Sequence, residues 1–125
     1  DNGRLAMLLA VLESRCGLNF SSAEVYLNVA GGYRLSDPAA DLAVAAALVS
    51  ALADKPLPER SIWFGEVSLA GEIRPVAHSG LRIKEAAKLG FSSACGPDDV
   101  ERSPGLNYRG LKQLSNLVDQ VIGTQ

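Results

Sequence analysis

The chain contains a helix start whose residue types suit acyl-transfer chemistry at every position but one. Asp37 is a good N-cap, and Pro38 suits the first helical position, where its missing N–H costs nothing. The side chain of residue 39 would lie in the first turn, where unpaired N–H groups and the positive end of the helix dipole favour a developing oxyanion. A hydroxyl there can act as a nucleophile, whereas the methyl of Ala39 cannot. The sequence therefore predicts a helix start shaped for a nucleophile that is absent.

Other residues with catalytic chemistry form weaker patterns. His78 is the only histidine, and we expect a cap or a surface residue rather than a triad with Ser79 or Ser50 and an aspartate. Glu66 and Glu72 flank a turn between two expected strands, and no partner spacing supports a catalytic acid pair. We therefore predict no catalytic residue outside the helix start.

The cysteines and the glycines form no cofactor motif. Cys16 and Cys95 lie far apart without CxxC spacing, so we expect buried, reduced thiols, which favours a cytoplasmic location. The chain has neither a G-x-x-x-x-G-K-[ST] phosphate loop nor a four-cysteine cluster. We predict that this domain binds no ATP, Mg²⁺ or Zn²⁺.

Basic residues are the candidates for contact with DNA phosphates. A net charge of −2 and a pI near 5.3 argue against a domain that is basic overall, but leave room for a basic face. Lys84 and Lys88 are four residues apart and share one side of an expected helix, whereas Arg82 points elsewhere but is long enough to swing. Arg74 lies just upstream, and Arg34 follows a Gly-Gly turn. These five residues are candidates for contacts with phosphates.

Two structural alternatives stand beside this interpretation. The helix face can simply be solvated, with Glu85 near enough to pair locally. Trp63 and Phe64 fit a core or a subunit interface better than a base-stacking platform.

The composition predicts one globular domain over residues 1–125. Hydrophobic residues make up 47% of the chain, enough for a core, and charged residues make up 21%. No apolar run reaches the roughly 18 residues of a membrane span, so we expect no membrane partner.

Periodicity and turn residues predict alternating helices and strands, which favours an α/β layered fold. The expected helices cover residues 4–16, 37–53, 79–89 and 110–122. The expected strands cover residues 25–29, 61–69 with a break at Gly65, 73–76 and 91–95. We expect Ser79 to cap the third helix, Gly90 to end it, and residues 96–99 to form a turn.

Four segments carry a specific resemblance that spans nearly the whole chain. Residues 25–34, 37–43, 64–76 and 81–90 resemble the RadA family of bacterial DNA repair proteins. The C-terminal domain of that family is related to the proteolytic domain of Lon protease. The resemblance implies a Lon-like fold, with helices layered on a small mixed sheet. It also implies that the chain is excised from a larger protein and lacks the N-terminal strand or strands of the domain.

The resemblance to Lon places its active-site residues on three positions here. The catalytic serine falls on Ala39, the catalytic lysine falls on Arg82, 43 positions later, and a threonine falls on Phe64. A Ser-Lys dyad needs a neutral amine, and an arginine stays protonated at any relevant pH. The resemblance therefore implies a domain without peptidase activity.

The family resemblance also implies a function for the parent protein. RadA proteins are DNA-dependent ATPases that promote branch migration in recombinational repair, with a RecA-like ATPase region and an N-terminal zinc ribbon. ATP, Mg²⁺ and Zn²⁺ are then expected only in missing N-terminal parts of the parent. The domain itself would be a non-catalytic scaffold of a hexameric ring and a surface for single-stranded or branched DNA in the bacterial cytoplasm.

Two alternatives stay open. The chain can be an active Lon-type peptidase domain that uses another nucleophile. It can also be the Lon-like, non-proteolytic domain of a magnesium-chelatase-like competence protein. The amino-acid sequences of residues 37–41 and 64–67 resemble RadA more than they resemble the competence protein.

Overall fold

The computed structural model describes residues 2–28 and 36–123. Its helices are α1 (Asn2–Cys16), the 3-10 turn η2 (Pro38–Ala40), α2 (Asp41–Ala53), α3 (Ser79–Lys88), α4 (Leu114–Val118) and the π-helical turn η3 (Asp119–Gly123). Its strands are β1 (Ser61–Trp63), β2 (Glu66–Val67), β3 (Ile73–Arg74), β4 (Ser93–Pro97) and β5 (Asn107–Leu111).

The strands form two small sheets. Three parallel strands are ordered β1-β4-β5, with Ser61 opposite Ser93 and Ser93 opposite Asn107. Strands β2 and β3 form a separate antiparallel pair. The α/β class is confirmed, but the expected single mixed sheet is wrong, because one sheet is purely parallel and the other is a purely antiparallel pair.

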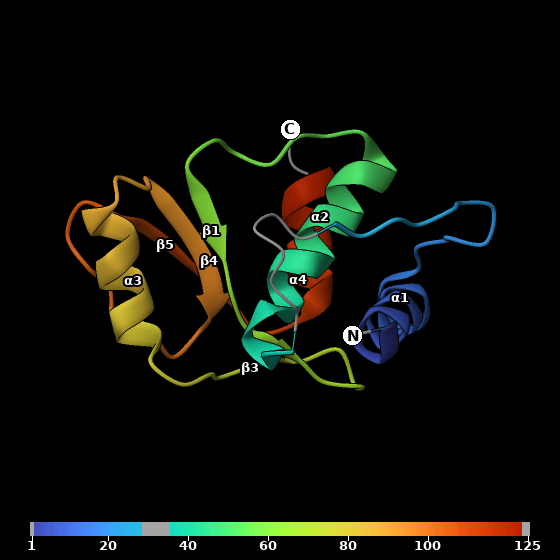
Figure 1. The fold of residues 1–125 in the computed structure, drawn as a ribbon, viewed down its shortest axis with the longest axis horizontal. Helices are drawn as coiled ribbons and strands as arrows, with labels where there is room; N and C mark the ends of the chain where they lie inside the picture. Colours follow the sequence, from blue (N-terminus) through green and yellow to red (C-terminus); the bar gives the residue numbers. More distant parts are fainter. Residues whose placement is uncertain (1, 29–35, 124–125) are drawn as a thin grey trace.

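Helices cover both faces of the three-stranded sheet (Figure 1). Helix α3 lies on one face, α2 and α4 lie on the other, and α1 packs beyond them at the opposite end of the molecule from α3. Successive strand residues therefore enter different cores. Ala94 packs in the core under α3, whereas Cys95 packs in the core shared by α1, α2 and α4.

The structure confirms the long helices and the loop after α2. Helix α1 buries Leu8, Val11 and Leu12 on one side, as its helical spacing predicts. Helix α2 is the central apolar helix, and Gly90, at φ +92°, follows the end of α3. Among residues 2–28 and 36–123, no helix is both long enough and apolar enough to cross a membrane.

Several element bounds are corrected by the structure. Residues 23–28 form no strand, and the expected strand's last residue lies outside the described residues, as does the Gly-Gly turn before Arg34. Strand β4 begins two residues later than expected and includes Gly96 and Pro97, so only Asp98 and Asp99 form the turn. The segments 61–69 and 73–76 form shorter strands than expected.

The largest correction concerns residues 107–123. Residues 107–111 form β5, so the last helix begins at Leu114 rather than at Gly110 and changes to a π-helical turn at Asp119. The expected cap at Ser79 is also wrong: the cap position is His78 at φ 62°, and the Ser79 hydroxyl donates to the carbonyl of Val76.

Candidate functional site

The predicted helix start has the expected capping geometry. Asp37 is extended, and its Oδ1 accepts a hydrogen bond from the Ala39 N–H at 2.9 Å. Pro38 begins the turn η2, which continues directly into α2 because the Asp41 N–H donates to the Pro38 carbonyl. The N-cap assigned to Asp37 is confirmed, and Ala39 lies in the first turn, where it is almost fully buried at 4% exposure.

The helix start is joined to the segment between β1 and β2. The Gly65 N–H donates to the Ala39 carbonyl at 2.8 Å, and the Leu42 N–H donates to the Gly65 carbonyl at 3.0 Å. Gly65 has φ +147°, and a Cβ there would lie 3.1 Å from Cγ2 of Ile73. The positive φ and the close approach of the Ile73 side chain therefore favour glycine at position 65.

Phe64 lies beside this junction and faces the core under α3. Its N–H donates to the Cys95 carbonyl at 3.1 Å, which extends the β1–β4 pairing by one residue. Its side chain is 5% exposed and packs with Ile83 and Ala86 of α3. At position 64, where the resemblance to Lon implies a threonine position, the chain has an apolar core residue.

Arg82 reaches the same helix start from α3. Its Nη2 lies 3.6 Å from Oδ2 of Asp37, and its Nε donates to the Ala77 carbonyl at 3.1 Å. Asp37 therefore links the two positions, since one carboxylate oxygen bonds the Ala39 N–H and the other faces Arg82. Both charged side chains are partly exposed, so the pair contributes little stability.

These three positions lie together, yet their side chains supply no nucleophile and no base. Ala39 has a methyl group, Phe64 has a phenyl ring, and Arg82 has a guanidinium that stays protonated. No group of three or more His, Cys, Asp or Glu side chains in the described part of the chain can hold a metal ion.

Known proteins match these same residues. A family described as subunit ChlI of Mg-chelatase matches residues 6–99, a range that contains Ala39, Phe64 and Arg82. The chain belongs to the ChlI family. The resemblance to RadA is also confirmed, because this ChlI-family chain is homologous over most of its length to proteins named DNA repair protein RadA.

Three RadA relatives illustrate the extent of the likeness. The Brucella abortus protein is 61% identical over 97% of the chain, the Rickettsia felis protein is 51% identical over 95%, and the Escherichia coli protein is 46% identical over 93%. The chain spans about a quarter of the length of each, 26%. It corresponds to a C-terminal part of these proteins.

The basic residues that are candidates for DNA contact differ in how free their side chains are in this ChlI-family domain. Lys84 and Lys88 are exposed on α3, and neither forms an ion pair within 4 Å among the described residues. Arg82 is held by Asp37, and Arg74 pairs with Glu72 at 3.3 Å. Arg34 lies outside the described residues.

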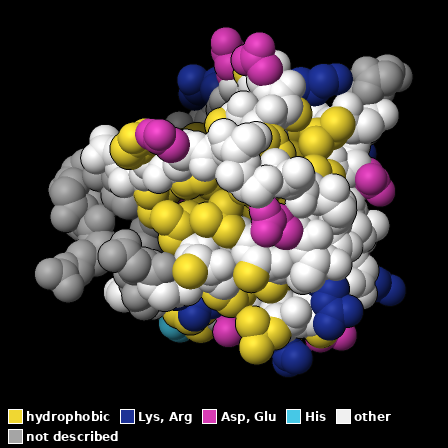
Figure 2. Space-filling view, turned by 90° about the vertical axis from the view of Figure 1, so that its right-hand side faces the viewer, with side chains coloured by type: hydrophobic (Ala, Val, Ile, Leu, Met, Phe, Trp, Pro, Cys, Tyr) yellow, Lys and Arg dark blue, Asp and Glu magenta, His cyan; other side chains and the backbone are white. Residues whose placement is uncertain are grey.

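The face opposite α3 has a different character (Figure 2). Hydrophobic side chains gather in its middle, with single acidic side chains among them, and Lys and Arg side chains lie along its edges. Among the basic candidates within the described ranges, Lys84 and Lys88 share one exposed surface, which belongs to α3.

The ion pair between Arg4 and the buried Asp41 was not predicted from the sequence. Asp41, 2% exposed, accepts a hydrogen bond from Arg4 Nε at 2.8 Å, a second from Arg4 Nη2, and one from the Val67 N–H at 3.0 Å. The carboxylate of Asp41 raises the pKa of Arg4. An aspartate in the first turn of an otherwise apolar helix was the available signal. The pair joins α1 to α2 and β2 beside the candidate site.

Proposed function

We propose that this chain is a non-catalytic, Lon-like scaffold and DNA-contact domain of a RadA-type protein. The parent would be a hexameric, DNA-dependent ATPase that promotes branch migration in recombinational repair in the bacterial cytoplasm. Its ATP, Mg²⁺ and Zn²⁺ would be bound by parts outside this chain. One observation carries the proposal: Asp37 bonds the backbone N–H of Ala39 and faces the guanidinium of Arg82, so the two positions offer a methyl group and a guanidinium where a Ser-Lys dyad needs a hydroxyl and a neutral amine.

The size of the catalytic loss supports a non-enzymatic role. Removing one partner of a catalytic unit in a serine protease reduces the rate by roughly a million-fold. Here both partners differ, while the capped helix start, the bond from Gly65 and the buried Asp41 keep the local fold in place. A domain that keeps this local fold but lacks the catalytic serine and lysine fits the role of a scaffold.

The proposed DNA contact depends on the exposed lysines of α3. Lys84 and Lys88 follow one another along the same helical side, so both ammonium groups can approach one phosphate backbone. Arg82 is the weaker candidate, because a phosphate would have to displace Asp37. Arg74 would have to leave Glu72 in the same way. The lysines therefore supply most of the proposed electrostatic attraction.

A second candidate has one observation in its favour. The match of residues 6–99 to the ChlI family fits the Lon-like domain of a magnesium-chelatase-like protein. The identity of 61% to a RadA protein over 97% of the chain is more specific, so we prefer the RadA-type parent. We expect a RadA-type parent to contain the sequence KNRFG beside its phosphate-loop motif, so a parent with a phosphate loop but without KNRFG would favour the second candidate.

A DNA-binding titration tests the contact surface. The change is Lys84→Gln combined with Lys88→Gln, measured by fluorescence anisotropy of a labelled single-stranded and a labelled branched oligonucleotide at several salt concentrations. We expect binding to weaken by at least about five-fold and the salt slope to fall by about 1–2, since each lost phosphate contact lowers it by about 0.7–0.9.

The matched control is Lys112→Gln, which removes the same charge from an exposed side chain outside α3. We expect its affinity and salt slope to equal those of the unchanged chain. An unaltered slope in the double variant would contradict the assignment of the α3 lysines.

A further inference from the structure

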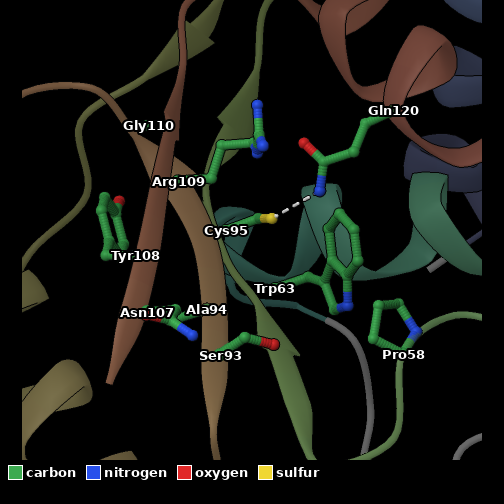
Figure 3. Close-up of a pocket in the computed structure, with 10 residues that line it drawn as sticks. All are labelled: Pro58, Trp63, Ser93, Ala94, Cys95, Asn107, Tyr108, Arg109, Gly110 and Gln120. Atoms are coloured by element: carbon green, nitrogen blue, oxygen red, sulfur yellow. Dashed lines mark hydrogen bonds between the residues drawn. The ribbon is translucent and has the colours of Figure 1, made fainter. Parts of the chain in front are cut away.

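A hollow of about 500 Å³ opens on the face of the three-stranded sheet that α3 does not cover (Figure 3). Its floor is formed by β1, β4 and β5, and Pro58 and Gln120 stand at its rim. The volume falls within the roughly 300–1,000 Å³ of pockets that bind small ligands. The hollow could not be predicted from the sequence, because residues 107–111 were not expected to form a strand.

The charge of the hollow favours an anion. Arg109 projects from β5 to the same side of the sheet as Cys95 and Gln120 (Figure 3). The side chain of Arg109 is exposed, and no Asp or Glu occurs among the described residues that line the hollow. Asp119 lines the adjoining hollow and limits the anion-binding region on that side. A guanidinium in this position suits a phosphate.

An aromatic ring and two amides lie within reach of the same space. The indole N–H of Trp63 already donates to the Ser61 hydroxyl at 3.1 Å, so the ring can offer its face to a ligand without leaving a polar atom unpaired. The Gln120 amide is fixed at the rim, because its Nε2 donates to Sγ of Cys95 at 3.1 Å. Asn107 lies at the other end of the hollow.

We infer that this hollow binds one nucleotide of single-stranded DNA, with the base on Trp63 and a phosphate at Arg109. The inference rests on the proposed DNA contact and names a second site for it. Stacking on an aromatic ring needs an unpaired base, since the bases of a duplex are already stacked within it. The hollow and the lysines of α3 lie on opposite sides of the sheet, so each site can be tested without the other.

The chain carries its own reporter for this test, because Trp63 is its only tryptophan. Thymidine 5′-monophosphate and a short oligothymidylate are titrated against the 125-residue chain while tryptophan fluorescence is recorded. We expect saturable quenching by both probes. Arg109→Gln should weaken binding of the mononucleotide by about five- to ten-fold, whereas combined Lys84→Gln and Lys88→Gln should leave it unchanged.

A second variant separates stacking from charge. Trp63→Phe retains an aromatic ring, and Trp63→Leu removes it; anisotropy of a labelled oligothymidylate follows both, with circular dichroism as the check on folding. We expect the leucine variant to bind at least about five-fold more weakly than the phenylalanine variant. Since both remove the indole, equal losses would contradict stacking.

Three results would overturn the inference. Oligonucleotide binding without any change in Trp63 fluorescence and with full affinity in Arg109→Gln would refute this site and leave the α3 surface standing. Quenching by a peptide with a free carboxylate, but not by thymidine 5′-monophosphate, would assign the hollow to a peptide. No binding of any DNA to the chain would reject both this site and the proposed DNA contact.

Discussion

At the scale of single residues, aspartates organise the candidate site. Asp37 caps the helix start and faces Arg82, while the buried Asp41 binds Arg4 and the Val67 N–H. Water can replace either partner of the exposed Asp37–Arg82 pair. It cannot reach the buried carboxylate of Asp41 to replace a lost partner there. The two aspartates lie four positions apart, and we expect the stability of the domain to depend mainly on Asp41.

Replacing Asp41 by asparagine tests that expectation. The amide keeps the size of the side chain but loses the charge and one acceptor. Its oxygen can still accept from the Val67 N–H, but its NH2 group then faces the Arg4 Nε donor, which loses its partner. We expect the free energy of unfolding to fall by about 2–3 kcal/mol. Urea denaturation should show a lower midpoint with an unchanged slope.

Asp54→Asn is the matched control. Asp54 is exposed at φ 55°, a conformation that asparagine tolerates well. The urea midpoint of Asp54→Asn should equal the midpoint of the unchanged chain within experimental error. Equal midpoints for both variants would show that the Arg4–Asp41 pair does not stabilise the domain.

Residue types predicted part of this site. The cap at Asp37 and the buried first turn at Ala39 follow from local rules that hold within one helical turn. The contacts from Arg4 to Asp41 and from Arg82 to Asp37 join residues 37 and 45 positions apart, and local rules contain no information about such contacts. The same limit hid Arg109, because its role depends on pairing between β4 and β5.

At the scale of elements, α2 is positioned by its backbone bonds to the segment at Gly65. The carbonyl of Ala39 and the N–H of Leu42 both bond Gly65, which lies between β1 and β2. Any side chain at position 65 would strain this contact through both its φ of +147° and the 3.1 Å approach to Ile73.

Gly65→Ala should therefore destabilise the domain. We expect a loss of about 1–3 kcal/mol in the free energy of unfolding, measured by thermal or urea denaturation. Gly80→Ala is the opposite case, since no atom lies within 4 Å of the new Cβ and the residue is inside α3. A gain of up to about 1 kcal/mol is expected there. Similar effects at the two glycines would argue against the tight junction at Gly65.

Elements with a strong local pattern were predicted and those that need a distant partner were not. Helix α1 has leucines at helical spacing, and α2 is an apolar run between a cap and a proline-rich loop. Residues 25–28 alternate like a strand but pair with none in the described part of the chain, and Tyr26 is 86% exposed. Strand β5 was missed because its polar residues gain their place only by pairing with β4.

At the scale of the whole molecule, the sheet separates two cores and two proposed surfaces. The smaller core lies under α3, whose outer side carries Lys84 and Lys88. The larger core joins α1, α2 and α4, and the hollow with Trp63 and Arg109 opens on that side of the sheet. The candidate site lies at the helix start before α2, where Arg82 of α3 faces Asp37.

The proposed scaffold role requires that the domain has no peptidase activity, and a direct peptidase assay tests this requirement. The purified chain is incubated with fluorescently labelled casein and with a serine-directed phosphonate probe, beside an active Lon protease as positive control. We predict no cleavage above buffer and no labelled serine, because Ala39 offers no hydroxyl and Arg82 no neutral amine. Cleavage that scales with chain concentration, stays with the chain through repeated purification and disappears when the chain is unfolded would show that the domain is an active peptidase.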